Sequence, residues 1–87
     1  MEIIVRKATE EEKELYSKYS TWNCKVSEFN WTYNDRETCV LLEGEVRVAY
    51  GDSQSVTFAD GDFVDFPKGL SCRWFVTKPV KKHYCFH

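Results

Sequence analysis

The feature that most constrains the fold is a regular succession of short apolar segments and turn residues. Between Trp31 and Val76, runs rich in β-branched and aromatic residues are interrupted about every six to ten residues by Gly, Pro, Asn or Asp. Alternation of apolar and polar positions is typical of strands with one buried face, and such turn residues separate strands in hairpins. The pattern predicts about seven to nine short strands and therefore an all-β sandwich or barrel.

The length of 87 residues indicates one domain that spans residues 1–87. A chain this short buries only roughly 60 to 65% of the surface that its unfolded form exposes, so it builds one modest core. Aromatic residues make up 16% of the chain, which is high for this length. Their rings are an efficient filling for a small barrel.

Charge and hydropathy exclude two classes of partner. The net charge is -2 and no basic stripe is present, so we expect neither a nucleic acid nor an anionic membrane as a partner. No apolar run approaches the roughly 18 to 20 residues of a membrane helix. The first residues lack the long apolar segment of a signal peptide, and we therefore expect a cytoplasmic location.

The four cysteines are expected to be reduced thiols. They are Cys24, Cys39, Cys72 and Cys85, and no pair has the CxxC spacing of a structural zinc site. A reducing compartment disfavours disulfides, although the number is even. Cys24 and Cys39 are interpreted as small core residues.

One short helix is predicted near the N-terminus. Thr9 followed by Glu12 forms a capping box, and acidic residues fill the first turn. Apolar residues at helical spacing then indicate a helix from about Glu10 to Tyr19. It has no broad apolar face, so we expect it to lie outside the barrel.

Strands are predicted wherever alternation is clear. Residues 22–28 are ambiguous, and Leu42 to Val46 is expected to form a tight corner between two strands, with a further turn at Lys78-Pro79. The predicted strands cover residues 3–5, 29–33, 37–43, 45–50, 55–59, 63–66, 72–76 and 80–87.

Two spacings in the central region resemble the motifs of a known superfamily. Glu37 is followed after six residues by Gly44, and Gly61 is followed by Pro67, Gly69 and Cys72 at intervals of five, one and two residues. These spacings resemble those of the cupins, which are small jelly-roll barrels, also described as double-stranded β-helices. The segments FNWTYNDRETCVLLEGEV, PKGLSCRW and KHY resemble short single-domain cupins related to the ureidoglycine aminohydrolase domain and the ethanolamine-utilisation cupins.

The residues that usually bind metal in cupins are mostly replaced. The resemblance places the two histidines of the first motif at Trp31 and Tyr33, and the histidine of the second at Cys72. Of the usual three His and one Glu, only Glu37 remains. One carboxylate and one thiolate are a poor donor set for Mn, Fe or Ni. We therefore do not expect the usual cupin metal site.

Glu37 is the first candidate catalytic residue. The resemblance implies that its side chain points into the barrel, where a carboxylate is costly unless it is hydrogen-bonded or neutral. One hypothesis is a general acid or base with a raised pKa. The other is a structural acid bonded to Tyr33, Arg36 or Arg73.

Cys72 is the second candidate catalytic residue, on the same strand face as Trp74. It is interpreted either as a nucleophile, redox-sensitive thiol or soft metal ligand, or as a small apolar core residue. A nearby Glu37 would raise the pKa of the thiol, which argues against a simple activated nucleophile.

Three aromatic residues are candidates for ligand binding. Trp31, Tyr33 and Trp74 are expected to line one cavity, an apolar slot for a small flat or carbon-rich ligand. The alternative is that they form the core of the barrel.

The last strand carries a further set of possible metal donors. His83, Cys85 and His87 alternate and share one face. Tyr84 and Phe86 compete for the inward face and are favoured there by their apolar character. A native metal at the three donors is therefore not the preferred interpretation.

Three functions remain open. The first is a module that binds a small metabolite in the barrel cavity without a three-histidine metal site. The second is a cupin enzyme, similar to the aminohydrolases, in which Glu37 transfers protons with or without a metal. The third is an interaction protein, and the apolar outward face at Val40 and Leu42 predicts a homodimer.

Overall fold

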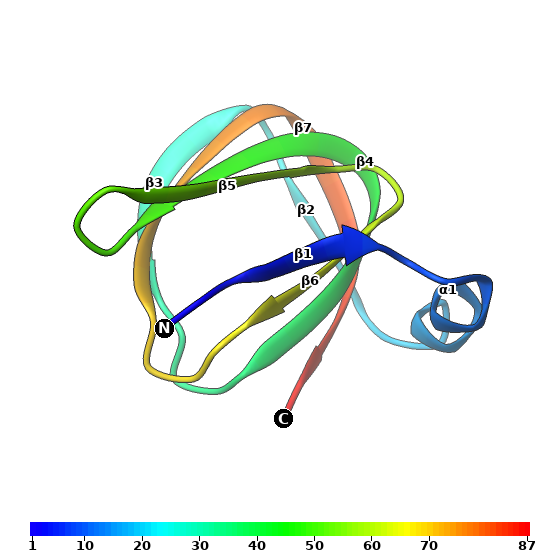
Figure 1. Ribbon diagram of the computed structural model, residues 1–87. Coiled ribbons are helices and arrows are strands. Elements are labelled where there is room, and N and C mark those ends of the chain that lie inside the picture. Colours follow the sequence, from blue (N-terminus) through cyan, green and yellow to red (C-terminus); the bar gives the residue numbers. More distant parts are fainter.

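A computed structural model describes all 87 residues as a small barrel with one helix at its side (Figure 1). The predicted all-β class is confirmed, and the ambiguous stretch 22–28 contains one strand and the start of the next. No helix is both long and apolar enough to cross a membrane. In chain order the elements are β1 (Ile4–Lys7), α1 (Glu10–Tyr16), β2 (Thr21–Cys24), β3 (Ser27–Thr32), β4 (Glu37–Tyr50), β5 (Gln54–Ala59), β6 (Asp62–Phe66) and β7 (Ser71–Phe86).

Two long strands, β4 and β7, form the centre of the barrel. They pair antiparallel along almost their whole length, from Glu37 opposite Phe86 to Tyr50 opposite Cys72. The first part of β4 also pairs with β6, and its last part pairs with β5. The first part of β7 pairs with β3, and its later part pairs with β2. One wall of the barrel contains β6 and β2 beside the first part of β4 and the later part of β7, and the other wall contains β5 and β3 beside the remaining parts. Each long strand therefore contributes to both walls, as the curved ribbons in Figure 1 show.

The predicted break at Gly44 is a bend within one strand. Gly44 has a φ of +109°, and a Cβ atom there would lie 2.5 Å from the carbonyl oxygen of Pro79. The pairing with β7 is irregular between Leu41 and Val46, opposite Val76 to Lys82. The predictions of two separate strands and of a chain turn at Lys78-Pro79 were therefore wrong. Both long strands bend here, because β-bulges bend the strands that contain them.

The bend also changes which residues of β4 face inward. Before it, Cys39 and Leu41 lie in the core, whereas after it Val46 and Val48 do. An odd-numbered series thus gives way to an even-numbered one, because a bulge inserts an extra residue into the strand. Val46 and Val48 are both completely buried.

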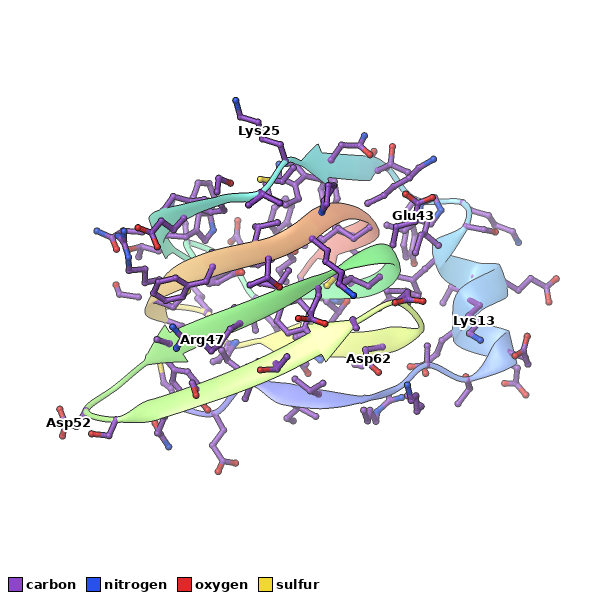
Figure 2. The ribbon with its side chains drawn as sticks, turned by 90° about the horizontal axis from the view of Figure 1, so that it is seen from above. Lys13, Lys25, Glu43, Arg47, Asp52 and Asp62 are labelled. Atoms are coloured by element: carbon purple, nitrogen blue, oxygen red, sulfur yellow. The ribbon has the colours of Figure 1, made fainter.

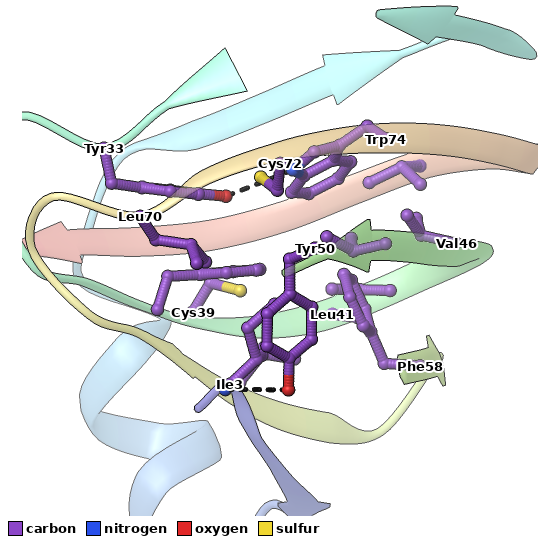
Figure 3. Close-up of a cluster of buried hydrophobic side chains, with 14 of the residues drawn as sticks. Ile3, Tyr33, Cys39, Leu41, Val46, Tyr50, Phe58, Leu70, Cys72 and Trp74 are labelled. Atoms are coloured by element: carbon purple, nitrogen blue, oxygen red, sulfur yellow. Dashed lines mark hydrogen bonds between the residues drawn. The ribbon is translucent and has the colours of Figure 1, made fainter. Parts of the chain in front are cut away.

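The core fills the space between the two walls (Figure 3). Phe58, Phe66 and Trp74 are almost completely buried, and their rings contact one another at centroid distances of 5.6 to 5.9 Å. By contrast, the labelled charged side chains in Figure 2, such as Arg47 and Asp52, lie on the outside.

The helix packs against the outside of the barrel, as predicted. It begins with the predicted capping box of Thr9 and Glu12 but ends at Tyr16, before the expected Tyr19. Tyr16 packs with Val40 and Phe63 in a small second cluster. Val40 is 2% exposed, so the helix covers part of the apolar face from which a homodimer was predicted, and Leu42 remains 41% exposed. Dimerisation stays a prediction.

Candidate functional site

A cavity of about 420 Å³ lies between β3 and the last part of β7. This volume is within the range of small-molecule sites. Six aromatic side chains form its walls, together with one acid and one lysine. The lining residues are Trp22, Phe29, Trp31, Tyr33, Glu37, Lys82, Tyr84 and Phe86. We call this space the aromatic pocket.

Strand alternation explains how these side chains converge. Phe29, Trp31 and Tyr33 are spaced two apart, so they point to the same side. Tyr33 lies just beyond β3, where its N–H donates to the carbonyl of Leu70 at 2.8 Å and its carbonyl accepts from Gly69 at 2.7 Å. These two bonds fix the strand end and thereby the direction of the phenol ring.

The floor of the pocket is a buried ion pair between Glu37 and Lys82. The Lys82 Nζ atom lies 2.5 Å from Glu37 Oε2, and each side chain is only 6% exposed. The resemblance implied that Glu37 points inward, and it does. Neither arginine considered for it is its hydrogen-bond partner: Arg36 binds Asp65, while Arg73 binds Asn30 and pairs with Glu28. Tyr33 is likewise not its hydrogen-bond partner.

Aromatic rings surround the ammonium group of Lys82. Its Nζ atom lies 4.9 Å from the Trp22 ring centroid, 5.0 Å from that of Trp74 and 5.9 Å from that of Phe66. Ring faces attract cations, and the attraction increases when water is excluded. These contacts, together with the Glu37 carboxylate, offset the free-energy cost of removing the Lys82 ammonium group from water.

Tyr33 connects the pocket to the core. Its hydroxyl accepts a hydrogen bond from Trp74 Nε1 at 3.2 Å (Figure 3), and its ring stacks on Phe66 at 4.6 Å. Burial, and secondarily the charge of Glu37, raises the pKa of the phenol, which therefore stays protonated. Trp74 is 2% exposed and lies behind the pocket. Of the three predicted aromatic residues, Trp31 and Tyr33 line the cavity and Trp74 supports it from the core.

Cys72 lies near Tyr33 but does not line the aromatic pocket (Figure 3). It borders a second, more open hollow of about 560 Å³ beside the turn between β4 and β5. Its thiol lies 3.6 Å from the carbonyl oxygen of Trp31. Burial raises the pKa of the Cys72 thiol to about 11, so the thiolate is scarce at neutral pH. A rise was expected from a nearby Glu37, whereas burial is its cause.

The residues at the cupin metal positions do not fit a divalent metal. Trp31 has no donor lone pair for a metal, and the phenol of Tyr33 is held protonated. The carboxylate of Glu37 is occupied by the ammonium group of Lys82, which would repel a second cation. No group of three or more His, Cys, Asp or Glu side chains is arranged to hold a metal ion.

The donor residues of the last strand lie on the opposite side from the pocket. His83 Nδ1 lies 3.0 Å from the carbonyl oxygen of Tyr19, and His87 Nε2 lies 2.7 Å from Thr38 Oγ1. Cys85 packs against the cluster beneath the helix. Tyr84 and Phe86 face the pocket, as their apolar character indicated.

Lys82 is a pocket residue that was not predicted from the sequence. It is two positions before Tyr84 and four before Phe86, so strand alternation places all three on one face. The signal was therefore present, but a lysine is rarely buried unless it is paired. Trp22 was missed because its segment was ambiguous, and Phe29 was predicted only as part of a strand.

Comparisons with known proteins agree with this architecture. The family model of the EutQ-like cupin domain matches residues 11–84. A DUF861 family protein from Thermotoga maritima is 46% identical over 99% of this chain and 100% of its own, with a TM-score of 0.93.

More distant structures share the fold. The EutQ protein of Clostridium difficile is 21% identical, with a TM-score of 0.71 over 98% of this chain and 67% of its own. A DUF861 protein of unknown function from Pseudomonas syringae is 28% identical, with a TM-score of 0.70 over 77% of this chain and 29% of its own. No curated protein matches the chain. The match over most of the sequence, carried by the same barrel, means that this chain belongs to the EutQ-like cupin domain family.

Proposed function

We propose that this protein binds a small organic molecule in the aromatic pocket, without a three-histidine metal site. The observation that carries the proposal is a cavity of about 420 Å³ whose walls are aromatic and whose floor is the ion pair of Glu37 and Lys82. Binding sites typically combine apolar walls with a few convergent polar groups that orient the ligand.

The exposed rim of the pocket supports the same proposal. Trp31 is 50% exposed and Phe86 is 54% exposed, although both are large apolar side chains. Covering such rings removes apolar surface from water, which is favourable, and each good aromatic contact with a flat ligand adds stabilisation beyond simple burial. A ligand that enters the pocket would cover both of them.

The test is a fragment screen read by thermal shift and by ¹⁵N-resolved NMR. We expect flat fragments to raise the melting temperature and to shift the signals of the pocket residues. Trp31→Ala should weaken binding at least about tenfold, because a half-exposed ring contributes mainly to the ligand contact. Leu42→Ala is the matched control on another surface. If fragments bind Trp31→Ala as well as the parent protein, or if none bind, the proposal fails.

Elemental analysis tests the metal-free part. Protein purified without an affinity tag and without added metal should contain no stoichiometric transition metal. A stoichiometric metal would contradict this part of the proposal.

A second candidate function is proton transfer by Glu37. It is favoured by one observation: the carboxylate lines the pocket and uses only Oε2 in its single hydrogen bond within the protein. A carboxylate with one free oxygen can take a proton from a bound molecule. Bound fragments should then exchange or transform over time in NMR, and Glu37→Gln should stop that change while binding persists. Unchanged turnover in Glu37→Gln would remove this role.

A further inference from the structure

The hydrogen-bonding capacity of the pocket floor is only partly used. Glu37 Oε1 accepts no hydrogen bond from the protein. No fully buried side-chain oxygen or nitrogen lacks a partner, so Oε1 must reach the cavity. Lys82 has three N–H donors but makes one hydrogen bond, to Glu37 Oε2. Both residues line the cavity, so its floor offers a carboxylate and an ammonium group side by side.

The floor carries no net charge, because one carboxylate is paired with one ammonium group. A charged ligand group would enter a largely apolar cavity without a counter-ion of its own, unless it separated the pair. Both alternatives are costly, since a buried charge needs a partner. An uncharged polar group avoids this cost. The floor therefore favours neutral ligands over carboxylates and amines.

The walls restrict the shape of the ligand. Six aromatic side chains line the cavity, and Glu37 and Lys82 are the only charged residues among its lining. A flat ring can lie between the aromatic side chains with one edge turned toward Glu37 and Lys82. On that edge, an N–H group meets the free carboxylate oxygen and a neighbouring carbonyl oxygen meets the ammonium group.

On the basis of the proposed function, we infer that the aromatic pocket selects uncharged flat rings that carry an N–H beside a C=O on one edge, as in a lactam or a heteroaromatic cyclic amide. Glu37 accepts from the ring N–H, and Lys82 donates to the ring carbonyl. The ion pair is then a specificity element as well as a structural one.

The first experiment compares five probes of similar size by NMR titration of the intact protein. They are 2-pyridone, N-methyl-2-pyridone, toluene, benzoate and benzylammonium. The three indole N–H signals report directly, since Trp22 and Trp31 line the pocket and Trp74 lies behind it. We expect 2-pyridone to bind about tenfold more tightly than N-methyl-2-pyridone, because methylation removes one buried hydrogen bond.

The charged and apolar probes distinguish failure of the inference from failure of the proposed function. Toluene should bind weakly, and the two ions more weakly than 2-pyridone. If toluene, benzoate or benzylammonium binds as tightly as 2-pyridone, the pocket binds ligands but the inference is wrong. If no probe shifts any pocket signal, the proposed function is wrong, and the inference with it.

A double variant tests the role of the floor itself. Glu37→Leu combined with Lys82→Met removes both charges together, so neither is left unpaired. It should bind toluene at least as well as the parent protein and lose the preference for 2-pyridone over its N-methyl form. Arg36→Met, next to Glu37 but outside the pocket, should keep that preference. If the double variant keeps this preference too, Glu37 and Lys82 do not recognise the N–H and C=O groups of the ring, and the inference is wrong. The comparison of probes on the parent protein tests the inference independently of these variants.

Discussion

Arg36 and Glu37 are neighbours in the sequence, yet their ion pairs lie on opposite sides of the barrel wall. Arg36 binds Asp65 on the outside with two hydrogen bonds of 3.0 and 2.9 Å, and its side chain is 48% exposed. Glu37 binds Lys82 inside, where both side chains are almost fully buried. The outer pair has good geometry but competes with water, so its net contribution is small. The inner pair is shielded from bulk water, so the loss of one partner leaves the other charge poorly compensated.

The comparison shows that hydrogen-bond geometry alone does not indicate what a pair contributes. Burial decides how much is lost when one partner is removed. The inner pair is also the one that lines the aromatic pocket. This contrast predicts effects of decreasing size, from the buried ion pair to the exposed one.

Removal of the buried ammonium group should have the largest effect. Lys82→Met leaves the carboxylate of Glu37 buried without a counter-ion, and we expect the free energy of unfolding to fall by roughly 3 to 5 kcal/mol. Urea denaturation measures the change. Arg36→Met is the matched outer variant and should change stability little. The double variant Glu37→Gln with Lys82→Met should recover most of the lost stability. Equal losses in Lys82→Met and Arg36→Met would contradict the expected difference between the inner and the outer ion pair.

The inward-facing thiol of Cys72 should react slowly. Its pKa of about 11, against an ordinary value of 9.0, lowers the thiolate fraction at neutral pH by about 100-fold. Alkylation with iodoacetamide, followed by mass spectrometry of the peptide containing Cys72, should show at least this retardation relative to the urea-unfolded chain. Rapid labelling of the folded protein at pH 7 would contradict the buried, protonated state.

Neutral hydrogen bonds on the outer face should matter less than the inner ion pair. Tyr16 and Thr38 share a hydrogen bond of 2.6 Å beneath the helix, and Thr38 also contacts His87. Tyr16→Phe should lower the free energy of unfolding by about 1 kcal/mol, because one neutral bond is lost and the ring is kept. Tyr19→Phe provides a control, since no hydrogen bond of its hydroxyl is present. A loss of stability as large as that in Lys82→Met would contradict the expectation that the neutral hydrogen bond contributes less than the buried ion pair.

The smallest effect is expected at the exposed pair of Arg6 and Glu12. Hydrogen bonds from Arg6 lower the pKa of Glu12 to about 2. A depressed pKa means that this pair stabilises the fold above the unfolded value of 4.5, and that the contribution is lost as the pH falls from about 4.5 to about 2. An NMR titration of the Glu12 side chain should show the low pKa, and Arg6→Met should raise it. An unchanged pKa in Arg6→Met would assign the shift to another cause.

The sequence was most informative where one rule decided the outcome. Alternation and turn residues predicted the all-β class, and the capping box predicted where the helix begins. The alternation rule failed at Gly44, because a bulge shifts the alternation by one residue, so that one bent strand has the sequence pattern of two strands. The aromatic walls were partly foreseen in Trp31 and Tyr33. The partner of Glu37 was not, since pairing across the barrel depends on the register of β4 and β7, which no local pattern specifies.

The bend at Gly44 and Pro79 has a consequence for how the protein folds. Because β4 and β7 pass through the bend into both walls, neither wall can form alone from residues close in sequence. The start of β4 must pair with the end of β7, where Glu37 lies opposite Phe86. Closing such a long loop costs entropy before any contact compensates for it, so folding should be slow for a chain of this size. Once closed, the two walls share their central strands and should open together. Hydrogen exchange should then give nearly equal, global protection to the amides of both halves of β4.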